Sequence, residues 1–274
     1  QVMQIDTNQD RLWATLMELG AENVLAFAVE PVGGLATGAQ MLFEDYANRV
    51  REICTKHGVY LVYDEILCGT GRTGRFLASH AWPDAHVEIV VLAKGLGSGY
   101  TPLSAALLPA TMVDELADLT GFNFSHTYSA NPVACATGMA VLDEYERHGL
   151  VAAAGERGAT LKTRLEKLAD KHPCIGDIRG EGLLMAVELV TDRETKTSYP
   201  ASFPPTEHVR ICGLEHGLII YSRRTANGRY GDWFMVAPPL TITEDECDEM
   251  IARLDATLSD CEFAAQTHMA EGIG

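Results

Sequence analysis

The sequence predicts an α/β fold, and three observations support this class. Short apolar runs at 24–30, 59–64 and 88–93 each have the length of a strand. A helical pattern separates the first two runs, and a long glycine-rich stretch separates the second from the third. Each run is nearly continuous rather than alternating, which is typical of parallel strands buried on both faces. We therefore expect a mostly parallel central sheet with helices on both faces.

The first half of the chain supplies this sheet and its helices. Residues 11–20 have the pattern of a helix that ends at Gly20, and residues 42–58 have that of a second helix with Gly58 as its C-cap. The second helix carries an apolar stripe formed by Tyr46, Val50, Ile53 and Cys54. A further short strand is predicted at 103–109, after the run at 88–93.

The second half has a different, α+β pattern. Pro132 begins a long helical stretch that is interrupted at Gly149 and continues through 159–172. The remaining predicted elements are strands at 183–190, 218–222 and 233–237, a helix around 206–217, and a final helix from Thr243 to about Cys261 in which Glu246 completes a capping box. We place the domain boundary at Gly149, so that residues 1–149 belong to a large domain and residues 150–274 form a smaller C-terminal domain.

Composition excludes several classes of function. The 274 residues include 21 Lys and Arg against 38 Asp and Glu, and the net charge of −17 disfavours nucleic acid and anionic membranes as partners. The seven Cys have no metal-ligand spacing, so we expect no metal site and reduced thiols in a cytoplasmic protein. No stretch approaches the roughly 20 apolar residues of a membrane helix.

The candidate chemistry lies at the ends of the predicted strands, where ligands collect in sheets of this kind. Glu30, Asp64, Glu65 and Lys94 all follow apolar runs. A lysine at such an exit is usually a solvated loop residue, and an aspartate is usually a turn residue. However, we expect the Lys94 ammonium to be poorly hydrated, which favours the neutral amine that attacks a carbonyl. Asp64 on a neighbouring strand could then pair with the protonated ring nitrogen of pyridoxal phosphate.

Six segments carry a resemblance to a known family. They are 29-VEPVGG-34, 63-YDEILCGTGRTGRF-76, 92-LAKGLGSGYTPLSA-105, 126-HTYSANPVACA-136, 178-IRGEGLLMAVEL-189 and 236-VAPPLTIT-243. In order and spacing the chain resembles the class III aminotransferases, which are fold-type I enzymes dependent on pyridoxal 5'-phosphate (PLP) and include the ω-transaminases. The likeness spans nearly the whole chain.

The resemblance implies roles for individual residues. Lys94 would bind the cofactor covalently and carry a proton to and from the substrate, while Asp64 would pair with the ring nitrogen and Ile66 would pack on the ring. Thr127 would reach the cofactor phosphate of a neighbouring subunit, which implies a homodimer with shared active sites. Glu30 resembles a glutamate that pairs with a C-terminal arginine in ornithine-type members.

The sequence departs from the family pattern at several positions. The arginine of ornithine-type members would fall at Met235, which puts that carboxylate switch in doubt. Arg223 and Arg224 are alternative carboxylate clamps, because guanidinium binds carboxylate bidentately, or else they belong to a solvated basic loop. Thr70 stands where an aromatic residue is common, and 129-SANP-132 stands where SGHP is usual.

The resemblance also sets the expected function and its alternatives. Residues 1–29 lack the helix N-terminus that holds the cofactor phosphate in the family, so we expect a fragment without the N-terminal part of the large PLP-binding domain. The expected activity is transfer of an amino group from an amine or amino acid to an α-keto acid such as pyruvate. The alternatives are an aminomutase, decarboxylase or racemase of the same fold, or a non-catalytic truncated chain.

Overall fold

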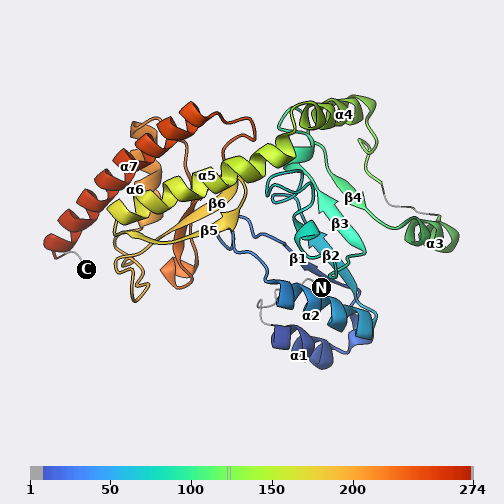
Figure 1. The fold of residues 1–274 in the computed structure, drawn as a ribbon. Coiled ribbons are helices and arrows are strands. Elements are labelled where there is room, and N and C mark those ends of the chain that lie inside the picture. The colour runs from blue at the N-terminus through green and yellow to red at the C-terminus, as the bar shows by residue number, and fades with distance from the viewer. Residues whose placement is uncertain (1–8, 122, 124, 273–274) are drawn as a thin grey trace. The chain divides into compact units, whose positions relative to one another are not determined.

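A computed structural model describes residues 9–121, 123 and 125–272 of the chain (Figure 1). The chain forms two compact units. The first contains the chain up to Pro31 together with 42–71 and 75–149, and the second contains 32–41, 72–74 and the chain from Leu150 onward.

The first unit consists of a four-stranded sheet and four helices. Its elements are α1 (Gln9–Leu19), β1 (Ala26–Val29), α2 (Glu44–His57), β2 (Tyr60–Asp64), β3 (Ile89–Leu92), β4 (Ala105–Leu107), α3 (Ala110–Thr120) and α4 (Pro132–Arg147), with short 3-10 helices η1 (Ala21–Asn23), η2 (Ala78–Ala81) and η3 (Lys94–Leu96). The strand order is β1-β2-β3-β4. The first three strands are parallel, as predicted, whereas β4 runs antiparallel to β3.

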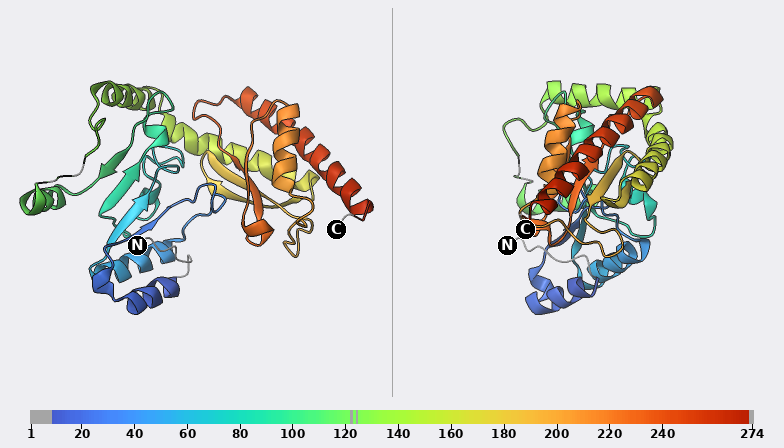
Figure 2. Two further views of the ribbon diagram at one scale, coloured as in Figure 1. Left: turned by 180° about the vertical axis from the view of Figure 1, so that it is seen from behind. Right: turned by 90° about the vertical axis from the view of Figure 1, so that its left-hand side faces the viewer.

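Helices α1 and α2 lie together against one face of this sheet (Figures 1 and 2). The buried core between them and the strands contains Leu12, Leu16, Val50, Ile53, Cys54, Val59, Leu61 and Tyr63. The predicted stripe of α2 therefore faces the core, with Tyr46 packed at its margin. Gly58 ends α2 in the left-handed conformation at φ 69°, as its C-cap assignment requires.

The opposite face of the sheet is more open than the sequence predicts. Along β1, burial alternates so that Ala26 and Ala28 are exposed, while Phe27 and Val29 pack on the α1–α2 core. The prediction that 24–30 is a buried strand is therefore wrong for the described residues. β1 is an edge strand here, and the helices packed on the sheet cover the face to which Phe27 and Val29 point.

Helix α3 was not predicted, and it differs from the other described α-helices in having no buried residue. The segment that joins it to α4 is also exposed wherever the structure describes it. Asn131 then caps α4 by accepting hydrogen bonds from the amides of Val133 and Ala134, at 3.0 and 3.1 Å, and Pro132 occupies the first turn. The predicted start of the helix at Pro132 is confirmed.

The second unit is an antiparallel sheet with three long helices. Its elements are α5 (Leu150–Lys171), β5 (Ile175–Glu181), β6 (Leu184–Leu189), α6 (Pro205–Glu215), β7 (Tyr221–Arg224), η4 (Ala226–Gly228), β8 (Asp232–Val236) and α7 (Glu244–Ala270). The strand order is β5-β6-β8-β7. Strand β5 was not predicted, and α7 extends beyond the expected end at Cys261. The Thr243–Glu246 capping box at the start of α7 is confirmed.

Side-chain donors attach the segment 32–41 to the second unit. Arg179 donates from Nε to the carbonyl of Gly38 at 2.6 Å, and Trp233 donates from Nε1 to the carbonyl of Leu35 at 2.8 Å. The Arg179 guanidinium also lies over the Trp233 ring, 5.4 Å from its centroid. No helix in the described ranges is long and apolar enough to cross a membrane.

Candidate active site at the strand exits

Asp64 is the last residue of β2 and is half-buried. Its Oδ1 accepts a hydrogen bond from the amide of Ile66 at 3.1 Å, which fixes the carboxylate at the start of the following turn. The second oxygen, Oδ2, receives no hydrogen bond from the residues that the structure describes. One half of the carboxylate thus orients the side chain, and the other half is left to bind a cation or a protonated ring nitrogen.

Lys94 follows β3 after a single extended residue, Ala93. The backbone of Lys94 turns into the left-handed region at φ 41° and enters η3, which directs the chain away from the strand. The side chain is exposed. The expectation of a poorly hydrated ammonium is therefore wrong for the described residues, because these residues leave the sheet edge around Lys94 open.

The strand register brings Asp64 and Lys94 to the same edge of one sheet. Asp64 lies opposite Val91 in the parallel β2–β3 ladder, and Lys94 follows three residues later. At about 3.3 Å per residue the two exits are offset by about 10 Å along the strands. Because parallel strands end at a common edge, both side chains start from the edge at which ligands bind in sheets of this kind.

The other five lysines of the chain lie elsewhere. Lys56 is on α2, near the start rather than the end of β2, and it is exposed. The remaining four, Lys162, Lys167, Lys171 and Lys196, belong to the second unit. Within the first unit, Lys94 is thus the lysine that the fold places beside Asp64.

Glu65 differs from Asp64 in being fully buried. Its carboxylate accepts hydrogen bonds from the amides of Ala78 and Ser79, at 2.6 and 3.0 Å, and from the Ser79 hydroxyl. The side chain therefore fixes the end of the glycine-rich loop that follows β2, at the point where the loop enters η2. We assign Glu65 a structural role, which separates it from the strand-exit residues that remain available to a ligand.

The glycine-rich loop packs closely on the protein itself. A Cβ atom on Gly69 would lie 2.7 Å from the Glu65 carbonyl oxygen and 2.8 Å from Leu92, so glycine is required there by packing. Arg72, which belongs to the second unit, donates to the carbonyls of Leu183 and Pro238. These contacts give the glycines and Arg72 structural reasons for their positions.

The other predicted site residues fall into two groups. Glu30 follows β1 and, by continuing the β1–β2 register one residue past Val29, lies level with Asp64. Ile66 is half-buried in the turn after Asp64, and Thr127 is exposed in the segment that joins α3 to α4. The structure thus brings Glu30, Asp64, Ile66 and Lys94 to one sheet edge, whereas Thr127 lies on a separate exposed segment.

Arg223 and Arg224 lie on β7 of the second unit, and they differ in their surroundings. Arg224 donates to both oxygens of the buried Asp232, at 3.2 and 3.3 Å, and to the carbonyls of Tyr199 and Asn227. Burial raises the pKa of Asp232 to about 6, although Arg224 acts in the opposite direction. Arg223 is exposed and makes no hydrogen bond or ion pair with described residues, so of the two it is the better candidate to bind a carboxylate.

Sequence reasoning missed Tyr145 as a residue of this region. Tyr145 lies on α4, and its hydroxyl donates to the carbonyl of Gly95, directly after Lys94, at 3.4 Å. In the sequence it follows Val141 by four residues, so it has the spacing of an ordinary core residue on a helix. A hydroxyl within this apolar stripe was the only available signal.

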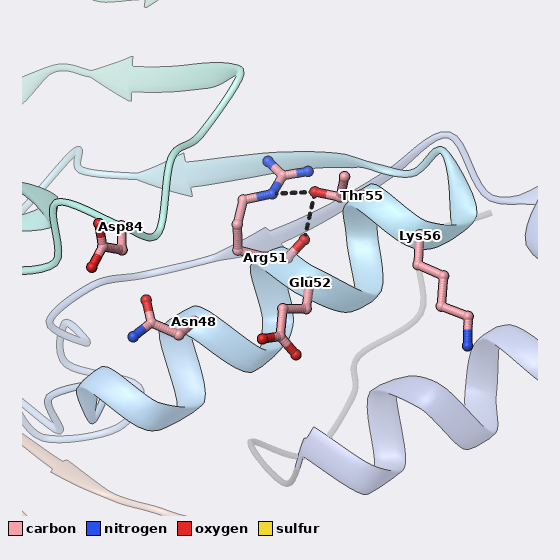
Figure 3. Close-up of a pocket in the computed structure, with 6 residues that line it drawn as sticks. All are labelled: Asn48, Arg51, Glu52, Thr55, Lys56 and Asp84. Carbon is pink, nitrogen blue, oxygen red and sulfur yellow. Dashed lines mark hydrogen bonds between the residues drawn. The ribbon is translucent and has the colours of Figure 1, made fainter.

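A polar hollow on α2 is not part of this site (Figure 3). Asn48, Arg51, Glu52, Thr55, Lys56 and Asp84 line it. Arg51 donates from Nε to Thr55 at 2.9 Å and binds both oxygens of Glu88, so its charge is neutralised within the protein. Burial opposes ionisation of Glu88, but the hydrogen bonds from Arg51 and the Leu61 amide outweigh it and lower the Glu88 pKa.

The strand exits carry the donor set that suits PLP. An amine on one parallel strand and a carboxylate with a free oxygen on the next are the groups that an aromatic aldehyde with a basic ring nitrogen requires. Fold and site together thus define a fold-type I PLP-dependent enzyme as the class of protein to which the chain corresponds.

Comparison with known proteins identifies the family. The sequence model of the class III aminotransferases matches residues 4–258. An uncharacterized aminotransferase, YodT of Bacillus subtilis, is 35% identical over 260 residues, which cover 94% of this chain and 58% of the relative. A leucine/methionine racemase of Thermococcus litoralis is 35% identical over 245 residues, covering 89% of this chain and 52% of the racemase. The chain belongs to the class III aminotransferase family.

Solved structures agree with this assignment. An (S)-enantioselective omega-transaminase from Thermomicrobium roseum has a TM-score of 0.84 and 33% identity, over 92% of this chain and 55% of that protein. An amine transaminase from an uncultivated Pseudomonas species, in its PLP-bound form, has a TM-score of 0.82 and 33% identity, over 92% and 56%. The predicted family and fold class are confirmed. The chain spans about half the length of the relatives it matches.

Proposed function

We propose that the protein containing this chain is a PLP-dependent transaminase that moves an amino group from an amine or amino acid to an α-keto acid such as pyruvate. The observation that carries the proposal is the placement of Asp64 and Lys94 at the exits of adjacent parallel strands in a class III aminotransferase. PLP is the cofactor that this family uses, and it would supply the electron sink that stabilises negative charge at the substrate Cα.

Each strand-exit residue has a task in this proposal. Lys94 would hold the cofactor, and its amine would move a proton at the substrate Cα by general acid–base catalysis. Asp64 keeps the ring nitrogen protonated through the carboxylate oxygen that the Ile66 amide does not use. Ile66 would pack on the ring face, and Glu30 is the candidate polar group for the substrate at this sheet edge.

We also propose a homodimer in which Thr127 contributes to the neighbouring site. The exposure of Thr127 and the lack of a buried residue among the described residues of α3 support this arrangement, because such surfaces are typical of interfaces. A domain boundary at 149/150 is supported by the division into compact units, although segments 32–41 and 72–74 fall in the second unit. A cytoplasmic location stays a prediction that agrees with seven unpaired cysteines.

A racemase is the second candidate, because a leucine/methionine racemase and the uncharacterized aminotransferase have the same identity of 35% to this chain. Both reactions use the same cofactor and lysine and break the Cα–H bond, and they differ in where the proton is returned, to Cα in a racemase and to the cofactor in a transaminase. Pocket shape sets this choice. Membership of the family is therefore compatible with both reactions.

Two parallel incubations separate the candidates. The protein is supplied with PLP, an amine donor and pyruvate, and in parallel with PLP and single enantiomers of amino acids. Formation of alanine with equimolar loss of the amine supports transamination. Loss of enantiomeric purity without consumption of a keto acid supports a racemase. The absence of both reactions, together with no Lys94-dependent absorbance of bound PLP, supports the non-catalytic alternative.

A further inference from the structure

The proposed reactive lysine and a residue of the glycine-rich loop both have unusual backbone conformations. Thr70 has φ 51° and Lys94 has φ 41°, both in the left-handed region that favours glycine. For a β-branched residue such as Thr70 this conformation is a true outlier. Strain of this kind persists where the surrounding structure enforces it, and it gathers at functional sites.

Gly95 is the point at which these two segments touch. A Cβ atom on Gly95 would lie 2.8 Å from Thr70 Oγ1 and 3.1 Å from Thr70 Cβ, which is closer than side chains normally approach. The same atom would lie 3.4 Å from the Tyr145 hydroxyl. Thr70 and Tyr145 thus enclose the residue that follows Lys94.

Tyr145 also forms a specific polar contact with this turn. Its hydroxyl donates to the Gly95 carbonyl at 3.4 Å, and that carbonyl also accepts the amide of Ser98 at 3.2 Å. Tyr145 is buried, and α4 is anchored below the turn by packing of Leu142 on the cluster that contains Leu96. The helix therefore holds the Lys94 turn through both an apolar contact and a hydrogen bond.

Thr70 contributes shape rather than a hydrogen bond. It is 1% exposed, and its hydroxyl has no hydrogen-bond partner among the described residues. A buried hydroxyl without a partner costs free energy, so its presence needs another reason. The contact with Gly95 supplies that reason, because the Thr70 side chain fills the space into which the Lys94–Gly95 peptide would otherwise relax.

We propose that Thr70 and Tyr145 are positioning residues that hold Lys94 in its left-handed conformation at the exit of β3, Tyr145 through the Gly95 carbonyl and Thr70 through contact with Gly95. The consequence for function rests on the proposed role of Lys94 as the cofactor-binding lysine. Neither residue touches the reacting atoms in this account. Both act by limiting the directions in which the lysine side chain can leave the strand.

The first test removes the Tyr145 hydroxyl and keeps its ring. In Tyr145→Phe the ring packing stays, and we expect capture of PLP at Lys94 to slow by about three- to tenfold, the effect of one hydrogen bond. Capture is measured by borohydride trapping and mass spectrometry, with exposed Lys56 in the same digest as the internal standard. Tyr60→Phe, at the start of β2, is the matched control and should leave the Lys94 to Lys56 ratio unchanged.

The second test uses the contact between Thr70 and Gly95. Gly95→Ala places a methyl group against Thr70 and should slow capture at Lys94, whereas Thr70→Gly suits φ 51° and removes the obstructing atoms. In the double variant the added methyl group has room, so capture should be faster than in Gly95→Ala alone. The pH midpoint of the absorbance of bound PLP should also differ more from wild type in Gly95→Ala than in the double variant.

Three results would overturn the proposal. The first is a ratio of PLP label on Lys94 to label on Lys56 in Tyr145→Phe that equals the wild-type ratio. The second is capture of PLP by the double variant that is no faster than capture by Gly95→Ala. The third is a change in melting temperature without a change in labelling or in the pH midpoint. Failure of the proposed function looks different, because wild-type protein would then show no trapped PLP at Lys94. In that case acetic anhydride labelling of Lys94 against Lys56, without PLP, still decides whether Tyr145 and Thr70 position the lysine.

Discussion

Asp64 and Glu65 are adjacent in sequence, but their carboxylates have different partners. Asp64 accepts the amide of Ile66 at 3.1 Å through one oxygen, while Glu65 is fully buried and accepts the amides of Ala78 and Ser79 and the Ser79 hydroxyl. Strand β2 ends between them, and the two side chains have separate surroundings. One acid remains available at the sheet edge, and the other fixes the glycine-rich loop.

Asp64→Asn tests the first of these roles. The amide oxygen of asparagine still accepts the Ile66 amide, but the negative charge that would keep a ring nitrogen protonated is lost. We expect transamination by the protein to fall by about 10²–10³-fold, the usual cost of losing one electrostatic contact to the reacting group. The melting temperature should change little. An unchanged rate of transamination would show that Asp64 is not part of the site.

Glu65→Gln tests the second role and is the matched control for Asp64→Asn. The NH2 of the glutamine amide would face backbone donors inside the protein, so we expect a loss of about 3 kcal/mol in the free energy of unfolding. At about 2–4 °C per kcal/mol this is a fall of about 6–12 °C in melting temperature. Calorimetry of the two variants side by side measures the difference. Equal melting temperatures would show that both acids have the same kind of role.

Two glycines of α5 should respond in opposite ways to alanine. A Cβ atom on Gly158 would lie 2.3–2.4 Å from the backbone of Gly182, so Gly158→Ala should cost about 3 kcal/mol through overpacking. A Cβ atom on Gly155 would meet only the Cα of Gly74, at an ordinary 3.6 Å. Gly155→Ala should therefore stabilise the helix by up to about 1 kcal/mol. Urea unfolding of both variants decides this, and a stabilising Gly158→Ala would contradict the close approach.

The stability of the second unit should fall in acid partly through Asp255. A hydrogen bond from Lys171 holds the pKa of Asp255 below its usual value of 3.8, with some opposition from burial and further help from His172. Because the folded pKa is lowered, this stabilisation is present above about pH 4 and is lost as the pH falls through the folded pKa. The ion pair is therefore intact at neutral pH.

Lys171→Gln isolates this contribution. We expect the variant to be less stable than wild type at pH 7 and to lose less stability between pH 4 and pH 2. Lys167 is an exposed lysine on the same helix, and Lys167→Gln is the control. It should leave the loss of stability between pH 4 and pH 2 unchanged. Urea titrations at successive pH values provide the comparison. Parallel curves for Lys171→Gln and wild type would show that the bond does not perturb Asp255.

The sequence predicted the parts of the fold that local physics determines. The parallel strands ending at Asp64 and before Lys94, the α2 stripe and the Thr243–Glu246 capping box all follow from periodicity and capping. Burial on both faces of β1 was wrong, because apolar composition alone does not say which face the described helices cover. The antiparallel β4 and the exposed α3 depend on longer-range packing, which no local pattern reveals.

The site was predictable at the strand exits and less so around them. Lys94 and Asp64 stand out because charge follows an apolar run, whereas Tyr145 has the spacing of a core residue. Arg224 and Arg223 look alike in sequence, and only the fold shows that Arg224 is engaged by buried Asp232. A buried partner eight residues away along a hairpin is a tertiary contact, and sequence spacing does not disclose it.

The central claim is that Lys94 is the residue that binds PLP. The direct measurement is to incubate the protein with PLP, reduce with borohydride, digest, and locate the pyridoxyl group by mass spectrometry in wild type and in Lys94→Ala. We expect a saturable label on the Lys94 peptide of wild type, with no equivalent label in Lys94→Ala. A label on another of the six lysines, or equal labelling of both proteins, would contradict it.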